Sequence, residues 1–437
     1  MIKTLQNALR VKDIRNRLLF TFLMILVIRF GSQLPVPGTD PSKMGDFWSK
    51  LKAGDAFNFL SAVSGGSYEN FSVLALGISP YITSSIIVQL LTIAIPKLEE
   101  LQKGGQEGRK KIQELTRYVT VILALIQATA MSIGFGNRGL FLEEAWFNVP
   151  SAVFCLTAGS AFLMWIGERI TQNGIGNGIS VVLLVNILSG LPDDLLTIYN
   201  SFMLNKSVAV TVVIAVFVVA VLAAIVAFAI LLNQGERRIP VQYAQKVVGR
   251  RSVGGRSSHI PIKANTAGVI PVIFTSSLLS LPTMVTQFVE IDPSSVGARI
   301  IAFLNSGNWF RPSVPYYSLG AVLYIAMIIA FAYFYTSITF NPMEIADNMK
   351  KSGGFIPGIR PGKPTSDYLT NTLNHMVIIG ALGLTVIAIF PMILTGVFNV
   401  GNLSLLGTSL LIIVGVIIET LKSIEAKMVA REYESIF

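Results

Sequence analysis

The sequence has few of the residues on which enzyme chemistry depends. Charged residues make up only 13% of the chain, and there are two histidines, His259 and His375, and one cysteine, Cys155. A single cysteine excludes an internal disulfide. The histidines are far apart and have no second thiol or carboxylate cluster near them, so we predict no metal site. With no Ser-His-Asp or Cys-His set and no pair of catalytic carboxylates, we predict a protein that is not an enzyme and uses no cofactor.

Hydrophobic residues, in contrast, make up 52% of the 437 residues. So large a share with so few charges is typical of a chain that lies in lipid rather than in water. Apolar runs near the roughly 20 residues needed to cross a bilayer predict ten transmembrane helices. These runs cover residues 18–34, 74–95, 116–135, 149–166, 179–192, 208–232, 267–288, 317–340, 373–395 and 404–421.

Lysine and arginine are distributed unevenly between the two sides of these ten crossings. Of the 34 Lys and Arg residues, 26 lie in the termini and the connections on their side, seven lie in the opposite connections, and Arg29 lies inside the first run. Basic connections stay in the cytoplasm, so we predict that both termini are cytoplasmic. The first run has no small-residue cleavage site after it, and we expect a retained helix rather than a signal peptide.

A transporter coupled to protons or sodium needs ionisable ligands at the middle of the membrane. The apolar runs contain almost none. Arg29 lies late in its run, and we expect it to reach the membrane interface, while Glu168 and Arg169 are expected to pair with each other at the end of the fourth helix. A secondary transporter is therefore the less favoured alternative, and a channel for neutral solutes stays open.

The second and seventh runs contain glycine and proline within apolar sequence, at residues 76–82 (LGISPYI) and 265–273 (NTAGVIPVI). These residue types interrupt helices. In two repeats of five helices the two runs are equivalent, and interrupted helices at equivalent positions indicate a functional interface between the halves. A path lined by Ile, Val and Leu would block ions and suit a large, extended and chemically varied passenger. The alternative is that each proline only kinks an ordinary helix.

The longer of two cytoplasmic connections, at about 233–266, predicts an extended hairpin. Apolar and polar residues alternate over Val241–Val248, and glycine follows, which places Arg250 and Arg251 at the tip. This basic connection could contact anionic lipid headgroups, ribosomal RNA phosphates or an acidic protein surface. A tip raised beyond the headgroups favours a macromolecular partner.

The other connection, at about 341–372, contains a segment that superficially resembles a phosphate-binding loop. Pro364 separates Lys363 from Thr365, so we expect that no helix begins there and predict no nucleotide site. Glycine and proline instead predict a rigid turn that presents Arg360 to a docking partner. The alternative is a solvated loop with a structural role only.

Five segments, in this order and spacing, resemble the SecY family of channel subunits in the bacterial general secretion translocon. They are residues 76–82, 174–180 (GIGNGIS), 267–271, 353–363 and 433–435. The resemblance implies an all-α membrane protein of the bacterial plasma membrane, with ten helices in two pseudo-symmetric inverted halves around a central hourglass pore. The halves are expected at residues 1–200 and 201–437. The implied function is to pass unfolded secretory polypeptides across the membrane and to release transmembrane segments sideways, between the second-third and seventh-eighth helices.

The resemblance also implies site residues. A ring of aliphatic side chains that seals the pore is expected at Ile78, Ile82, Leu183, Ile187, Ile273 and Ile412; the alternative for them is ordinary helix packing. A plug is expected at about residues 57–71, including Ser64, Gly65, Gly66 and Tyr68. Loops that contact the motor or the ribosome are expected to include Lys246, Arg250, Arg251, Gly358, Arg360, Pro361 and Gly362.

Several partners follow from the same resemblance. They are the SecE and SecG subunits, the SecA motor ATPase, the ribosome during co-translational insertion, signal peptides and nascent chains, membrane lipid, and a second copy of the chain in a dimer.

Overall fold

A computed structural model gives the structure of residues 11–40, 43, 64–137, 139–142, 145–204, 206–243, 246–248, 251–253, 257–285, 295–312, 314–398 and 408–434. Most of these residues are helical. The helices are α2 (Lys12–Gly31), α5 (Ser79–Ala94), α6 (Pro96–Lys103), α7 (Gly105–Asn137), α8 (Ala145–Asn173), α9 (Gly178–Ile198), α10 (Val208–Gln234), α11 (Ile270–Val285), α12 (Val296–Leu304), α13 (Leu319–Thr339), α14 (Pro342–Lys351), α15 (Lys363–Phe398) and α16 (Thr408–Glu434), with the short helices η2 (Tyr199–Met203), η3 (Ser306–Asn308) and η4 (Pro315–Ser318). Each of the ten predicted runs coincides with one of the longer helices.

Within the described residues, six helical stretches are long and apolar enough to cross a bilayer. They are Gly105–Asn137, Phe147–Asn173, Gly178–Ile198, Val208–Gln234, Pro315–Lys351 and Lys363–Leu394. A seventh results if α5 and α6, which meet at a bend of 108°, form one span. Helix α11 is shorter, and α2 and α16 carry charged residues. The structure confirms a helical, multi-pass membrane protein, whereas the exact number of ten crossings is not confirmed.

The second and seventh runs are interrupted, as predicted. Helices α5 and α11 begin only at the residue before Pro80 and Pro271, and turns precede both. Proline in the first turn of a helix removes an N–H that has no intrahelical partner, so it costs no hydrogen bond. Gly77 and Gly268, each three residues before the proline, have φ of 58° and 64°, where glycine is unstrained. The alternative of two kinked continuous helices is therefore wrong.

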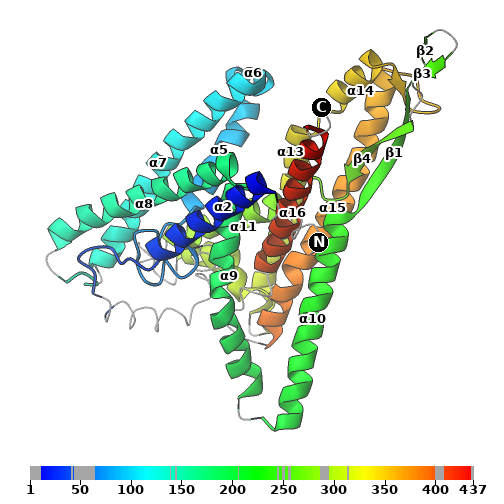
Figure 1. The fold of residues 1–437 in the computed structure, drawn as a ribbon. Helices are drawn as coiled ribbons and strands as arrows, with labels where there is room; N and C mark the ends of the chain where they lie inside the picture. Colours follow the sequence, from blue (N-terminus) through cyan, green and yellow to red (C-terminus); the bar gives the residue numbers. More distant parts are fainter. Residues whose placement is uncertain are drawn as a thin grey trace.

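A three-stranded sheet joins the connection between α10 and α11 to the connection between α13 and α15, and a separate two-stranded sheet extends the first. Strand β1 (Glu236–Tyr243) pairs antiparallel with β4 (Ser257–Lys263), and β2 (Lys246–Val248) pairs with β3 (Arg251–Val253). The extended hairpin is therefore confirmed, and Arg251, predicted at its tip, pairs with Val248 at the start of β3. On its other edge β1 pairs with β5 (Gly354–Phe355), which belongs to the second connection. The sheet and α14 lie at one end of the molecule, and the link between α9 and α10 lies at the opposite end (Figure 1).

Two large apolar cores hold the helices together. One is built mainly by α10, α13, α15 and α16, all from the second half of the chain. The other combines α2, α5, α8 and α9 from the first half with α11 and α16 from the second. Because this second core is the place where the two halves of the chain meet, it is where a path between them would lie.

Candidate functional site

All six residues of the predicted ring lie in the core that joins the two halves. Ile78 directly precedes α5 and Ile82 lies in its first turn, Leu183 and Ile187 come from α9, Ile273 from α11, and Ile412 from α16. Each is at most 8% exposed. The spacing of four within the two pairs places both members of a pair on one helical face. The four helices therefore direct these aliphatic side chains toward one another and away from lipid.

A cavity of about 420 Å³ lies against this cluster. Its floor is aliphatic and includes Ile82, Leu183 and Ile273. Its wall is polar and is built by five helices and the turn before α9. The polar wall residues are Tyr81, Ser85, Gln89, Gln113, Arg117, Glu168, Thr171, Gln172, Asn177, Ser180 and Tyr335. The cavity thus presents polar side chains on one side and apolar surface on the other.

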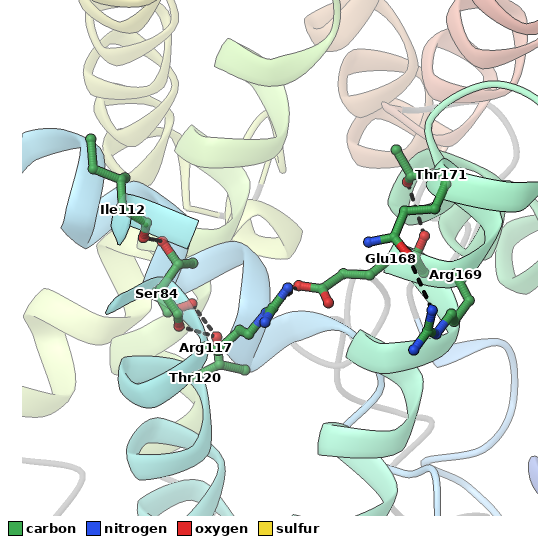
Figure 2. Close-up of polar contacts among 10 residues, drawn as sticks. Ser84, Ile112, Arg117, Thr120, Glu168, Arg169 and Thr171 are labelled. Atoms are coloured by element: carbon green, nitrogen blue, oxygen red, sulfur yellow. Dashed lines mark hydrogen bonds and ion pairs between the residues drawn. The ribbon is translucent and has the colours of Figure 1, made fainter. Parts of the chain in front are cut away.

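An ion pair joins α7 and α8 in the cavity wall. Arg117 Nε donates to Glu168 Oε1 at 2.7 Å (Figure 2). Their side chains are 41% and 22% exposed, so solvent screens the pair and it contributes about 1 kcal/mol or less. The expected pairing of Glu168 with Arg169 is wrong. Arg169 instead donates to Gln172 Oε1 and lies 5.5 Å from the ring centroid of Trp165, because adjacent residues of a helix point to different sides.

The polar wall was missed in the sequence, although a signal for it exists. Tyr81, Ser85 and Gln89 recur every fourth residue in a mainly apolar run, and Gln113 and Arg117 have the same spacing. Residues four apart form a stripe on one face of a helix. A polar stripe within a transmembrane helix indicates a surface that faces water or protein rather than lipid.

The predicted plug is described only from Ser64 onward, and residues 57–63 lie outside the described residues. Gly65 through Phe71 form successive turns, and Ser72, the next residue, makes an isolated β-bridge to Pro35. Ser64 and Tyr68 are buried, and Gly65 and Gly66 have φ of 63° and 78°. The two glycines therefore occupy a backbone region that other residues adopt only with strain.

Arg29, which was expected to reach the membrane interface, contacts the predicted plug. Its Nη1 donates to the carbonyl oxygen of Gly65 at 3.3 Å. Ser189 Oγ of α9 lies 3.2 Å from the same oxygen. One carbonyl in the predicted plug thus contacts helices α2 and α9 together, a contact that the sequence did not indicate.

The connection between α13 and α15 forms the predicted turn. Gly358 and Gly362 have φ of 82° and 102°, Pro361 lies between them, and Arg360 is exposed. Thr365 Oγ1 donates to the Arg360 carbonyl at 2.9 Å, which closes the turn.

The expectation that no helix begins at Pro364 is wrong, because α15 starts at Lys363. Pro364 occupies the first turn, where its missing N–H leaves no acceptor unpaired.

In the first connection, Lys246 and Arg251 belong to β2 and β3, and Arg250 lies outside the described residues. Arg238 Nε donates to Glu236 Oε1 at 2.7 Å, and this hydrogen bond lowers the pKa of the Glu236 carboxyl below its usual value. The acid at the base of the hairpin is thus paired with a neighbouring cation. Across the described ranges, no group of three or more His, Cys, Asp and Glu side chains is placed to hold a metal ion.

Comparisons with known proteins agree with this geometry. A family model described as SecY matches residues 72–421. "Protein translocase subunit SecY" of Halalkalibacterium halodurans is 42% identical over 440 residues, and that of Bacillus licheniformis is 41% identical over 444; each alignment covers 99% of both chains.

Solved structures share the fold. "The structure of a protein conducting channel" matches with a TM-score of 0.63 and 16% identity, and "Sec61 in the Canine ribosome-channel complex from the endoplasmic reticulum" with 0.57 and 15%. Both alignments cover 95% of this chain and 93% of the other.

Proposed function

The chain belongs to the SecY family, and from this we propose that it forms a protein-conducting channel in the plasma membrane. It passes unfolded secretory polypeptides across the membrane and releases transmembrane segments sideways into the bilayer. The single observation that carries the proposal is the cluster of six aliphatic side chains, drawn from both halves of the chain, beneath a polar cavity. The alternative of a transporter or solute channel is not favoured, because the cluster offers no polar ligand to a small solute or ion.

We propose that the six ring residues seal the closed channel. Aliphatic side chains exclude water from a constriction, and a dewetted constriction blocks ions. Such side chains also make no directional bond to a passing chain, so polypeptides of varied sequence can cross. The wall above the ring stays hydrated, since Arg117 and Glu168 and the amides of Gln89 and Gln113 line it.

The lateral opening is proposed between α5 and α11. Both helices line the cavity, α5 through Tyr81 and Ile82 and α11 through Ile270, Ile273 and Phe274. A hydrophobic signal segment that enters between them would bury apolar surface worth roughly 25 cal/mol per Å², which opposes the packing of the closed state. The chain's halves, 1–200 and 201–437, would then separate, and the plug at about 57–71 would leave the ring.

Partners are proposed for the end of the molecule that carries the sheet. Because β5 pairs with β1, the connection that carries the turn around Arg360 lies against the base of the hairpin that carries Lys246 and Arg251, and we call these two connections the platform. We assign this platform to the SecA motor and the ribosome, and the termini to the same cytoplasmic side. SecE, SecG, lipid and a second copy of the chain are proposed around the helices, and no enzymatic activity is proposed for this chain.

Reconstitution tests the function directly. Vesicles that contain the chain with its partner subunits are given the motor, ATP and an unfolded precursor, and in parallel a panel of small neutral and ionic solutes. We expect the precursor to become protected from external protease while solute uptake stays at the level of empty vesicles. Solute uptake without precursor protection would support the alternative and contradict the proposal.

The role of Arg360 is tested in the same vesicles. Arg360→Glu is expected to abolish motor-driven import, because it reverses the charge that the turn presents, while the protein itself still inserts into the membrane. Import at the wild-type rate in this variant would show that Arg360 does not take part in the contact with the motor.

A further inference from the structure

The carbonyl oxygen of Gly65 is contacted by two helices that are far apart in the sequence. Arg29 Nη1 of α2 donates to it at 3.3 Å. Ser189 Oγ of α9 lies 3.2 Å from it, but its single hydrogen is also directed to the Asn186 carbonyl at 2.6 Å. Since Ser189 shares one hydrogen between two acceptors, Arg29 supplies the larger part of the stabilisation. We call these two hydrogen bonds the Gly65 contact.

The charge of the Arg29 guanidinium strengthens its hydrogen bond to the Gly65 carbonyl. Arg29 is partly buried near the end of α2, and within the described ranges no carboxylate lies within ion-pair distance of it. A partly buried cation without a hydrogen-bonding partner is unfavourable, and hydrogen bonds to charged groups are stronger than neutral ones. Arg29 therefore favours the position of the turn in which the Gly65 carbonyl accepts its hydrogen bond.

The backbone of Gly65 also fits closely against α9. A Cβ added at Gly65 would lie 2.8 Å from both the Asn186 Cα and the Ser189 Oγ, which leaves no room for a side chain. Gly66 has the same sign of φ, but a Cβ added there meets no atom within 4 Å. A substitution at either glycine would thus strain the backbone in the same way, but only a side chain at Gly65 would clash with α9.

We propose that Arg29 is a positioning residue that holds the plug-proximal turn in the closed position through the Gly65 contact, and thereby sets how hydrophobic a signal must be to open the channel. This inference rests on the proposed function, since it concerns the plug of that channel. Opening would require the turn to leave both α2 and α9. A weaker Gly65 contact would lower the free energy needed to move the turn, so weakly hydrophobic signals would be able to open the channel.

The first experiment compares Arg29→Met with Arg17→Met in reconstituted vesicles. Both residues are arginines of α2, but Arg17 bonds to Asp13 and to the Gln172 carbonyl and not to the plug. Import is measured for two precursors that differ only in signal hydrophobicity. The weak-to-strong ratio is the import of the precursor with the weakly hydrophobic signal divided by that of the precursor with the strongly hydrophobic one. Loss of a charged hydrogen bond is expected to raise this ratio about tenfold in Arg29→Met, and Arg17→Met should keep the wild-type ratio.

The second experiment compares Gly65→Ala with Gly66→Ala and keeps the inference testable if Arg29→Met does not fold. Both variants carry similar strain from positive φ, so the difference between them reports the clash with α9. We expect the weak-to-strong ratio to rise about fivefold more in Gly65→Ala than in Gly66→Ala. Melting temperature is measured for all four variants, because a general loss of stability would lower the import of both precursors and leave the ratio unchanged.

The outcomes separate this inference from the proposed function. If wild type imports the strong-signal precursor while folded Arg29→Met keeps the wild-type ratio, or Gly65→Ala behaves as Gly66→Ala does, the Gly65 contact does not set the threshold. If wild type imports neither precursor, the proposed function fails instead.

Discussion

The floor and the wall of the cavity lie side by side but are built by different forces. The floor, with Ile82 and Leu183, is held by apolar packing alone. The wall is held by directed bonds, among them the ion pair of Arg117 with Glu168 and the hydrogen bond from Gln89 to Ser85. The comparison teaches that one cavity can combine a polar surface with an aliphatic surface that does not bind water. Substitutions in the floor should therefore change leakage, and substitutions in the wall should change stability.

The largest effect is expected from a polar side chain in the aliphatic ring, whether at Ile82 in the cavity floor or at Ile412 in the core next to it. Ile412→Asn, and separately Ile82→Asn, should raise ion leakage through resting channels about tenfold or more, because an amide hydrates the constriction. They should also relax the requirement for a functional signal. Single-channel conductance in planar bilayers measures the leak. Ile417→Asn is the matched control, since Ile417 lies on the same helix and is exposed; equal leakage in all three variants would show that the ring does not form the seal.

A smaller effect is expected from Thr171→Val in the wall. Thr171 Oγ1 accepts from the Gly178 N–H at 2.9 Å, and valine would leave that donor without its partner, which costs about 1–2 kcal/mol of unfolding free energy. Thermal unfolding in detergent measures this, and leakage should stay at the wild-type level. Thr129→Val is the control, because Thr129 makes only the bond to the carbonyl four residues earlier. Equal losses in the two variants would mean that the Gly178 bond contributes nothing.

Breaking the ion pair of Arg117 with Glu168 should lower the unfolding free energy by less. Glu168→Gln is expected to lower stability by about 0.5–1 kcal/mol, and the exchange of Arg117→Glu with Glu168→Arg should restore part of it. Glu100→Gln, on the exposed surface of α6, serves as the reference. A rise in leakage in Glu168→Gln would contradict the separation of wall from floor.

The smallest effect is expected from Gln89→Leu. Leucine removes the hydrogen bond from Gln89 Nε2 to Ser85 Oγ, and it also removes the buried Oε1, which no donor reaches in the described part of the chain. These two changes oppose each other, so the melting temperature should stay close to that of wild type. A clear decrease, larger than that of Ser85→Ala, would show that Oε1 has a partner that stabilises the wall.

Some features of the fold could be predicted from the sequence, because they are caused by residues at the same place in the chain. Glycine and proline restrict the backbone where they stand, so the interruptions near Pro80 and Pro271 were predictable. The hairpin around β1 and β4 was predictable from alternating residues and the glycine that follows. The start of α15 at Lys363 was missed, because proline was taken to end a helix although it is tolerated in the first turn.

The site depends on tertiary packing, which the sequence does not display. Ile412 is 2% exposed and Ile417 is 44% exposed, yet both are isoleucines in the same apolar run, and only the family resemblance distinguished them. In the same way, Glu168 has Arg169 beside it in the sequence but pairs with Arg117 from another helix. The contact of Arg29 with Gly65 joins residues 36 positions apart and had no local signal.

Crosslinking to a stalled secretory chain tests the central claim most directly. Cys155→Ala removes the native thiol, and single cysteines then replace Ile78, Ile187, Ile412 or, as the outward-facing control, Ile417. We predict that a polypeptide arrested in transit crosslinks to the first three positions and not to the fourth. Crosslinks at position 417 alone, or at none of the four, would contradict a polypeptide path through the aliphatic ring.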